Sequence, residues 1–360
     1  MTATDTIPAH AVAPILKVQN LVTTFSVSGS KIQAVRDISY DLRAGEILCV
    51  VGESGSGKSA SVNSLLGLLP PPPSSVTTGS VIFGGEDLLA MPERRLRGIR
   101  GKEIAMIFQD PATSFNPVQT IGSQIVEAIK NHERHMSRKA VKARAVELLT
   151  MVGVPSPQVR YGQFPHEYSG GMRQRAMIAM ALANHPKVII ADEPTTALDV
   201  TIQAQILELL EKVRAETDTA TILITHDLGI VAEVADRVLV MYAGKIVESG
   251  TVLEVFARPQ HPYTLGLLAS LPRIDTTMDE LLSIPGQPPS MAPPPNGCAF
   301  HLRCELSNGR QLCREQIPPF VSTGGDGTHL AACHFADEMD RQAVAVAEAV
   351  GADVRAGSTS

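Results

Sequence analysis

The sequence predicts an α/β fold with a mixed core sheet, an antiparallel β edge and a helical subdomain, followed by a small cysteine-rich module. Short apolar runs alternate with helical patterns, and a glycine-rich loop joins one such run to a helix. Four of the five cysteines lie within residues 298–333. Aromatic residues make up only 4% of the chain, so the core must be mainly aliphatic, as buried parallel strands usually are.

The first half of the predicted domain begins with strands. Residues 15–25 and 34–41 alternate apolar and polar side chains, which indicates antiparallel strands at a sheet edge. Residues 46–51 form a short apolar run typical of a buried strand. A helical pattern over residues 58–69 follows the glycine-rich loop and ends at four prolines, which cannot continue a helix.

The second half alternates helices and strands. Residues 109–174 are mostly helical, and residues 139–152 carry an apolar stripe made of Val141, Ala145, Leu148, Leu149 and Val152. Strands are predicted at residues 188–191 and 221–225, with a helix over residues 202–213 between them. This succession implies a right-handed parallel crossover.

These patterns predict four segments. A flexible N-terminus covers residues 1–14, and the main α/β domain covers residues 15–272 with its helical subdomain at about 110–175. Residues 273–335 hold a proline-rich linker and the cysteine-rich module. Residues 336–360 form a tail that could begin as a helix.

Bulk properties limit the function classes. The net charge is −6 and no dense block of Lys and Arg occurs, which argues against a generic nucleic-acid-binding surface. The N-terminus lacks the pattern of a signal peptide, and no run reaches the ~18 apolar residues of a membrane span. We therefore expect a cytoplasmic protein that reaches a membrane only through a partner.

The glycine-rich loop carries the strongest chemical signal. It matches the G-x-x-x-x-G-K-[ST] pattern between a strand and a helix, where backbone N–H groups can surround phosphates. Lys58 is expected to reach the β- and γ-phosphates, and the Ser59 hydroxyl to coordinate Mg²⁺. The predicted ATP-binding residues of the loop are Gly52, Ser54, Gly55, Ser56, Gly57, Lys58 and Ser59.

An acidic pair follows a later strand. Asp192 comes at the carboxyl end of the apolar run 188–191, the edge at which open α/β sheets bind ligands. With the phosphate loop present, Asp192 is expected to hold Mg²⁺ together with Ser59. Glu193 can act as general base toward the attacking water.

A second glycine pair separates this chain from other phosphate-loop enzymes. The segment Tyr168-Ser169-Gly170-Gly171-Met172-Arg173-Gln174-Arg175, which ends 16 residues before Ala191, resembles the signature sequence of ABC ATPases. The resemblance covers about residues 15–270 and implies a P-loop NTPase fold of ABC type. It also implies that Ser169, Gly170, Gly171 and Met172 contact the γ-phosphate bound by a partner subunit. Tyr168 and Met172 replace the usual Leu and Gln.

The same resemblance assigns roles to four further positions. Gln109 resembles the Q-loop glutamine, which implies that it also contacts Mg²⁺ and takes part in catalysis. His226 resembles the switch histidine near the γ-phosphate, which implies a catalytic role as well. Ala197-Leu198-Asp199 resembles the D-loop, in which Asp199 reaches toward the partner. Phe25 lies where the family places an aromatic side chain against adenine, although an ordinary core Phe explains it equally well.

The C-terminal cysteines resemble those of oligopeptide and dipeptide importer ATPases. Cys298, Cys304, Cys313 and Cys333 are separated by 5, 8 and 19 residues, and such a small loop-rich segment has little core of its own. The resemblance implies a [4Fe–4S] cluster held by all four. Zinc and free thiols remain open, because the spacing alone does not select a metal. Cys49, inside an apolar strand, is predicted to be a core residue.

The resemblance implies an ATP-hydrolysing, Mg²⁺-dependent subunit of a peptide importer at the cytoplasmic face of the membrane. Its partners are two permease subunits, a second ATPase subunit that is either a related chain or another copy, and indirectly an extracytoplasmic substrate-binding protein; nucleic acid is not among them. Three alternatives remain: import of nickel or glutathione, a soluble ABC ATPase acting on nucleic acid or the ribosome, and a regulatory module without turnover.

Overall fold

A computed structural model describes residues 13–196, 199–270, 284–323 and 327–339. The predicted N-terminal segment 1–14 and the tail 336–360, with its expected helix, therefore lie almost entirely outside the described residues. The same holds for the beginning of the predicted linker and for Ala197 and Leu198 of the predicted D-loop.

The main sheet is mixed, as the sequence predicts. Its strand order is β11-β12-β10-β9-β3-β8-β7-β6. The five strands from β9 to β6 pair in parallel, whereas β10, β12 and β11 continue the sheet antiparallel. The eight strands are β3 (Ile47–Val51), β6 (Ile104–Ile107), β7 (Val188–Asp192), β8 (Ala220–Ile224), β9 (Arg237–Tyr242), β10 (Lys245–Thr251), β11 (Val321–Ser322) and β12 (Leu330–Ala331).

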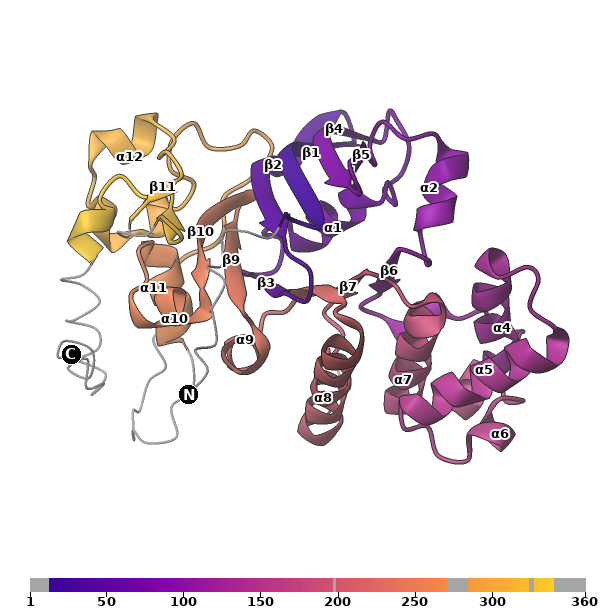
Figure 1. The fold of residues 1–360 in the computed structure, drawn as a ribbon. Coiled ribbons are helices and arrows are strands. Elements are labelled where there is room, and N and C mark those ends of the chain that lie inside the picture. Colours follow the sequence, from indigo (N-terminus) through magenta and orange to yellow (C-terminus); the bar gives the residue numbers. More distant parts are fainter. Residues whose placement is uncertain (1–12, 197–198, 271–283, 324–326, 340–360) are drawn as a thin grey trace, which may run out of the picture.

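The antiparallel strands near the N-terminus form a sheet of their own (Figure 1). Its order is β2-β1-β4-β5, with β1 (Leu16–Val27), β2 (Ser30–Leu42), β4 (Ser75–Phe83) and β5 (Glu86–Asp87). Val62 and Leu65 of helix α1 (Lys58–Leu65) join a core cluster shared by the two sheets. The helix ends four residues before the predicted end at residue 69, because the chain turns at Gly67, which has φ 58°.

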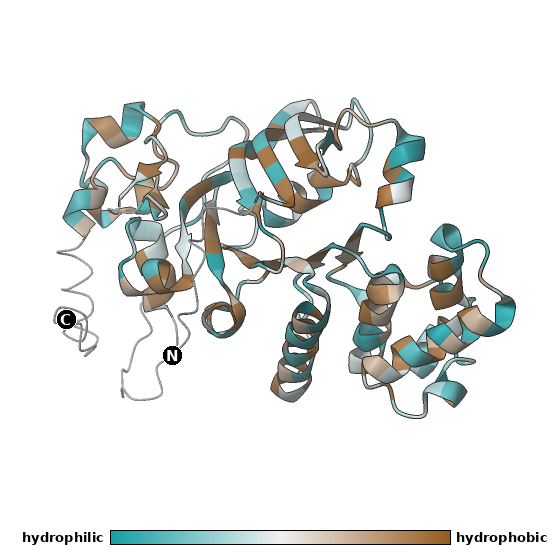
Figure 2. Cartoon of the chain, in the orientation of Figure 1, coloured by the Kyte–Doolittle hydropathy of each residue, from teal (hydrophilic) through white to brown (hydrophobic). Residues whose placement is uncertain are grey.

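The predicted helical region is present. Helix α5 buries Val141, Ala145, Leu148 and Leu149, and Val152 directly after it is also buried, so the predicted apolar stripe is confirmed. Figure 2 shows hydrophobic and hydrophilic residues alternating along α4, α5 and α7. The elements are α2 (Glu93–Ile99), α3 (Pro111–Ser114), α4 (Ile121–His132), α5 (Arg138–Met151), α6 (Pro157–Arg160), α7 (Gly170–Ala181) and the 3-10 turns η1 (Pro165–Glu167) and η2 (Leu182–Asn184).

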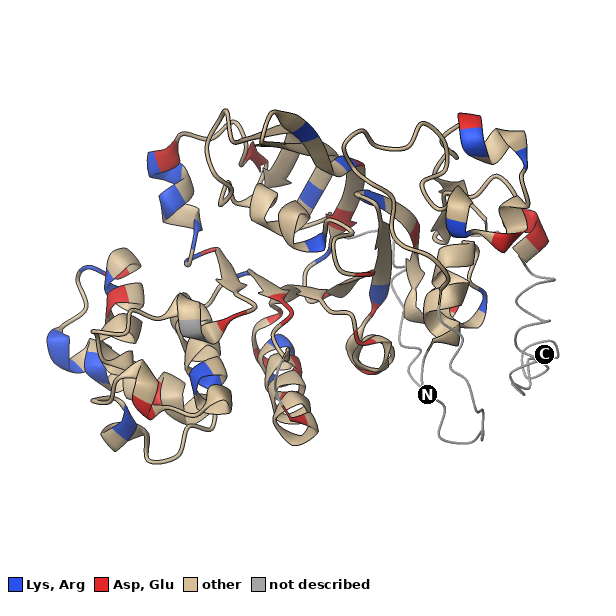
Figure 3. Ribbon diagram, turned by 180° about the vertical axis from the view of Figure 1, so that it is seen from behind, with Lys and Arg blue, Asp and Glu red and all other residues tan. Residues whose placement is uncertain are grey.

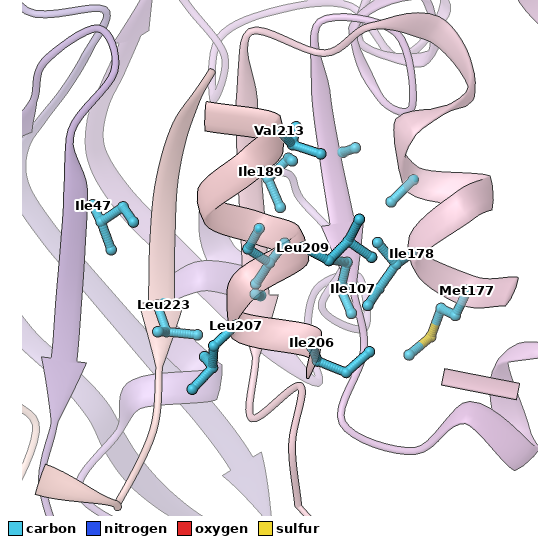
Figure 4. Close-up of a cluster of buried hydrophobic side chains, with 14 of the residues drawn as sticks. Ile47, Ile107, Met177, Ile178, Ile189, Ile206, Leu207, Leu209, Val213 and Leu223 are labelled. Carbon is cyan, nitrogen blue, oxygen red and sulfur yellow. The ribbon is translucent and has the colours of Figure 1, made fainter. Parts of the chain in front are cut away.

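The parallel strands are buried on both faces. In β3, Leu48 and Val50 face the core cluster shared with the antiparallel sheet, whereas Ile47, Cys49 and Val51 face the helices on the other side. Figure 4 shows Ile189 and Leu223 of the sheet beside side chains of α8 (Val200–Thr217), and Ile107 beside Ile178 of α7. Cys49 is fully buried, so its predicted core role is confirmed. Helix α9 (Leu228–Val234) lies on the same side of the sheet.

The C-terminal segment is joined to the main sheet rather than standing apart. Strand β12 pairs with β10 through Ala331 and Leu330. Phe300 packs against Tyr242 and Tyr263, with ring centroids 5.2 and 5.4 Å away. This segment therefore shares the core of the main domain, to which Phe300 contributes. The remaining elements are α10 (Val252–Ala257), α11 (Pro262–Ala269), α12 (Gln311–Glu315), η3 (His301–Arg303), η4 (Glu305–Ser307) and η5 (Ala336–Glu338).

Across the part of the chain that the structure describes, no helix combines the length and the apolar character needed to cross a membrane.

Candidate functional site

The glycine-rich loop lies between β3 and α1, at the carboxyl edge of the parallel strands. Gly52 has φ 150°, and a Cβ there would lie 2.2 Å from the carbonyl oxygen of Met241 in β9. Gly57 has φ 101°, and its Cβ would lie 2.2 Å from the carbonyl oxygen of Ala34. Both positions therefore require glycine for two reasons, backbone conformation and close packing. The loop fits tightly between β9 and the antiparallel sheet.

Lys58 and Ser59 open helix α1 at the end of this loop. The Lys58 ammonium donates hydrogen bonds to the carbonyl oxygens of Gly52 (2.7 Å) and Glu53 (3.0 Å). Burial lowers the pKa of Lys58, while the nearby carboxylates of Glu193, Asp192 and Glu53 raise it. The ammonium thus lies inside the curve of the loop, where phosphate oxygens would replace the two carbonyl partners.

Ser59 meets the acidic residue from β7. Its hydroxyl donates to Asp192 Oδ1 at 3.0 Å. Asp192 is 5% exposed, and burial raises its pKa, an effect partly opposed by the hydrogen bond from Ser59. A hydroxyl and a buried carboxylate side by side are the hard oxygen ligands that suit Mg²⁺. These residues fit the predicted metal.

Glu193 is at the centre of a second group. Its Oε2 accepts hydrogen bonds from Gln109 Nε2 (2.9 Å) and from the Thr196 hydroxyl (2.8 Å). His226 Nδ1 lies 3.6 Å from Glu193 Oε1. The structure therefore brings together three residues with a predicted catalytic role. They are Gln109 after β6, Glu193 after β7 and His226 after β8.

The backbone at Glu193 is unusual. Glu193 has φ 47°, a left-handed conformation that side chains with a Cβ rarely adopt. Its N–H donates to the carbonyl oxygen of Ile224 at 3.0 Å, which ties this turn to the end of β8. Strained backbone of this kind gathers at functional sites, where it fixes the direction of a side chain.

The predicted signature lies elsewhere, at the start of α7. The Ser169 hydroxyl accepts the N–H of Met172 as the N-cap of the helix, and Ser169 and Gly170 are exposed. A surface hollow is lined by residues 169–172 together with Asp199 and Ile202. Asp199 is the N-cap of α8, where its carboxylate accepts the N–H of Ile202 at 2.9 Å. The signature and Asp199 therefore share one open surface.

Two other predicted positions have different surroundings. Tyr168 is buried, its hydroxyl donates to the carbonyl oxygen of Arg160 at 3.0 Å, and burial raises its pKa to about 12. Phe25 is half-buried on β1. Two residues earlier on the same strand, the Thr23 hydroxyl is 2.7 Å from that of Ser64 in α1.

Some residues at the site were not predicted. Thr196 holds Glu193, Tyr263 accepts the N–H of Glu53 in the phosphate loop (2.7 Å), and Arg303 pairs with the Glu53 carboxylate. The phosphate-loop pattern leaves the position of Glu53 unrestricted, so it gives no signal. Arg303 is 250 residues away in the chain, and only the folded structure shows the contact.

The four C-terminal thiols lie near one another. Burial raises the pKa of each, to about 11 for Cys298 and about 12 for Cys333, and neighbouring cysteines add to the shift at Cys298, Cys304 and Cys333. The Cys298 N–H donates to the carbonyl oxygen of Cys313. None of the four forms a disulfide with another described cysteine. However, no group of three or more His, Cys, Asp or Glu side chains among the described residues is arranged to hold a metal ion.

Two protein families match the chain. Residues 35–196 match the family described as ABC transporter, and residues 247–313 match the C-terminal region of oligopeptide/dipeptide transporters. The second match includes Cys298, Cys304 and Cys313.

Two relatives from Bacillus subtilis (strain 168) are about half identical to it. The oligopeptide transport ATP-binding protein OppD is 54% identical, over 86% of this chain and 86% of its own. The dipeptide transport ATP-binding protein DppD is 50% identical, over 92% of this chain and 97% of its own.

Solved structures are similar as well. A dimeric ATP-binding cassette in a post-hydrolysis state, MJ0796 bound to ADP and Pi, is 27% identical with a TM-score of 0.60. That match covers 66% of this chain and 98% of the cassette. CbiO1 from Clostridium perfringens, part of an ABC transporter complex, is 27% identical with a TM-score of 0.56, covering 68% and 91%.

Proposed function

Because the chain belongs to the family of ABC transporter ATP-binding proteins of the oligopeptide and dipeptide type, we propose that it hydrolyses ATP to power peptide uptake through a membrane permease. The convergence of Gln109, Glu193 and His226 beside Lys58 and the Ser59–Asp192 pair carries the proposal. A phosphate cradle, a metal-binding pair and a positioned base lie at one edge of the sheet. This is the set that phosphoryl transfer to water requires.

Glu193 is the general base of the proposed reaction. Its carboxylate accepts the proton of the water that attacks the γ-phosphate. Gln109 and Thr196 hold one carboxylate oxygen, and the other faces His226. His226 is 64% exposed at its side chain, so it can contact the γ-phosphate from the open side of the site.

The phosphate loop and the metal-binding residues hold the nucleotide. Lys58 and the N–H groups of residues 52–59 bind the phosphates, and Phe25 lies against the adenine. Asp192, Ser59 and Gln109 are the residues that hold Mg²⁺. When bound, Mg²⁺ neutralises charge on the β- and γ-phosphates.

The exposed signature is the binding surface for a second nucleotide. The N–H groups at the start of α7 give it the partial positive charge of a helix N-terminus. Ser169, Gly170, Gly171 and Met172 contact the γ-phosphate bound by a partner ATPase, and Asp199 in the same hollow reaches across the interface. The partner is a related chain or another copy of this one.

The proposed place of action is the cytoplasmic face of the membrane. Two permease subunits hold the chain there, near Gln109, and an extracytoplasmic substrate-binding protein delivers the peptide. Figure 3 shows acidic residues interspersed with basic ones over the described fold, which supports a protein partner rather than nucleic acid.

The test is phosphate release by the complex purified with its permease. Wild-type complex should release phosphate in the presence of Mg²⁺, and Glu193→Gln should reduce the rate by at least about a hundredfold. ATP binding should survive the substitution, because Glu193 does not contact the phosphates in the proposed reaction. Phosphate release by Glu193→Gln at the wild-type rate would exclude Glu193 as the base.

A second proposal concerns the C-terminal cysteines. Their closeness and the shared effect on pKa support a metal site made by Cys298, Cys304, Cys313 and Cys333. The thiols do not converge on one point in the described residues, so the fit is incomplete. A [4Fe–4S] cluster accounts for four ligands. Zinc and free thiols are the competing states.

Iron, sulfide and zinc should be measured in anaerobically purified protein together with an absorption spectrum. About four irons and four sulfides per chain, lost in Cys304→Ser, would establish the cluster. Stoichiometric zinc, or no metal, would exclude it and leave the ATPase proposal intact.

A further inference from the structure

The C-terminal module contacts the phosphate loop directly through one ion pair. Glu53 is the second residue of the loop, and its carboxylate accepts two hydrogen bonds from the Arg303 guanidinium. The distances are 2.7 Å from Nη1 to Oε2 and 2.9 Å from Nη2 to Oε1. Such a two-point contact between planar groups fixes direction as well as distance.

The Arg303 side chain is fixed by contacts with its own module and with β9. Its Nε donates to the carbonyl oxygen of Pro285 (2.8 Å), and its Nη1 also lies 3.3 Å from the Tyr242 hydroxyl. The guanidinium lies 5.8 Å from the ring centroid of Tyr242 and 5.9 Å from that of Phe300. Its side chain is 5% exposed. The guanidinium is therefore a fixed point, not a freely moving surface charge.

The loop is held at the same place from two other directions. The Glu53 N–H donates to the Tyr263 hydroxyl of α11 at 2.7 Å, and Gly52 lies against Met241 of β9. Ser54 and Gly55, which follow, are exposed, and a Cβ at Gly55 would meet no atom within 4 Å, so this turn of the loop has little side-chain packing to hold its shape. Fixing Glu53 therefore limits the conformations of a segment that otherwise loses much entropy on binding phosphate.

Arg303 has an electrostatic effect as well. The Glu53 carboxylate belongs to a loop that must accept the negative charge of a triphosphate. Unpaired, it would repel the ligand across a partly buried site, where charges are screened less than in water. The guanidinium neutralises it.

We propose that Arg303 is a positioning residue for the ATP site, which fixes Glu53 and neutralises it so that the phosphate loop is ready to bind the triphosphate. The inference rests on the proposed function, because it assigns a role at the same site. It makes the C-terminal module a structural part of that site.

Binding of a fluorescent ATP analogue with Mg²⁺ to the full-length chain tests the inference, with thermal unfolding measured in parallel. Arg303→Met should raise the Kd by about tenfold or more, because the loop loses its anchor and Glu53 keeps its charge. The Kd of Arg303→Lys should lie between those of wild type and Arg303→Met, since Lys keeps the charge but not the two-point contact. Assays should run well below the Tm of each variant.

A double substitution separates positioning from general stability. In Glu53→Gln/Arg303→Met both charges are gone, so the repulsion is absent and the Kd should recover at least part of the loss seen in Arg303→Met alone. A purely structural role would lower the Tm without this pattern in Kd. The double variant also leaves no unpaired buried charge, so it provides a folded protein if Arg303→Met does not.

Arg310→Met is the matched control. Arg310 belongs to the same module and makes a comparable two-point pair with Glu338 (2.9 and 2.9 Å), with its guanidinium 4.0 Å from the ring centroid of Phe335. The Kd of Arg310→Met for the ATP analogue should equal that of wild type. An equal Kd in Arg303→Met and wild type, or an equal rise in Arg310→Met, would overturn the inference and leave the proposed function standing. A wild-type chain that binds no nucleotide would overturn both.

Discussion

Asp192 and Glu193 are neighbours in sequence with different surroundings. Asp192 is at the end of a buried strand, where burial raises its pKa, and its side chain accepts one hydrogen bond from Ser59. Glu193 turns away through a left-handed backbone and is held by Gln109 and Thr196. One backbone turn thus separates the proposed metal-binding carboxylate from the proposed general base.

The raised pKa of Asp192 has a consequence for stability. A carboxyl group whose pKa is higher in the folded state stabilises the fold at low pH, and this contribution is lost as the pH rises through that pKa. Asp192→Asn should therefore raise the Tm of the metal-free chain at pH 7, by about 2 °C. The gain should shrink as the pH falls, and Mg²⁺-dependent phosphate release should be lost.

Thermal unfolding between pH 4 and pH 7, with the assay of phosphate release, checks both parts. Ser59→Ala is a useful comparison, because it removes the hydroxyl but keeps the buried charge. A lower Tm in Asp192→Asn at pH 7 would show that the ionised carboxylate stabilises the fold. That result would contradict the raised pKa of Asp192.

At the scale of elements, the start of α7 is fixed from its buried side. Tyr168 packs in the core and donates to the carbonyl oxygen of Arg160, while the next residue, Ser169, is exposed and caps the helix. The change from buried to exposed within two residues presents the signature to solvent. The unusual Tyr at this position therefore acts through packing and one hydrogen bond.

Tyr168→Phe should test that role. The ring stays buried but the Arg160 carbonyl loses its donor, so the free energy of unfolding should fall by about 1 kcal/mol. Phosphate release should change little, because the Ser169 cap remains. Chemical denaturation measures the first quantity. A large loss of phosphate release in a chain of unchanged stability would instead give the Tyr168 hydroxyl a part in the signature contact.

The elements also differ in how far their sequence predicts them. The apolar stripe of α5 has a clear helical period, and β3, β7 and β8 are short continuous apolar runs; each element is present near its predicted bounds. The helix after the phosphate loop is shorter than predicted, because the turn at Gly67 ends it before the prolines do. The strands β11 and β12 have two residues each, too few for a periodic pattern, and they are strands because β12 pairs with β10 and β11 pairs with β12.

At the scale of the whole molecule, the C-terminal module is anchored to the main α/β domain. Glu248 of β10 is fully buried, and His329, just before β12, lies with its Nε2 2.8 Å from Glu248 Oε1. The Glu248 carboxylate also accepts the N–H groups of Gln260 and His261. Glu248 therefore links the sheet, α11 and the module. The sequence could not predict this contact, because it joins positions 81 residues apart.

His329→Ala tests how much the contact between His329 and Glu248 stabilises the fold. It leaves the buried Glu248 carboxylate without its side-chain donor, which should lower the free energy of unfolding by about 3 kcal/mol. Denaturation of the full chain measures the loss. His226→Ala is the control, because its exposed side chain should affect phosphate release and not stability. Equal stability of His329→Ala and wild type would mean that the module is not anchored through Glu248.

Peptide uptake into vesicles is the direct test of whether ATP hydrolysis by this chain powers peptide import. The complex of this chain with its permease, its partner ATPase and its binding protein should be reconstituted with ATP and Mg²⁺ on the side of the ATPases. If ATP hydrolysis at this site powers uptake, peptide should accumulate only when ATP is present. Accumulation should stop in Glu193→Gln, although that variant still binds ATP. Accumulation that continues at the wild-type rate in Glu193→Gln would contradict the claim that hydrolysis at this site powers uptake.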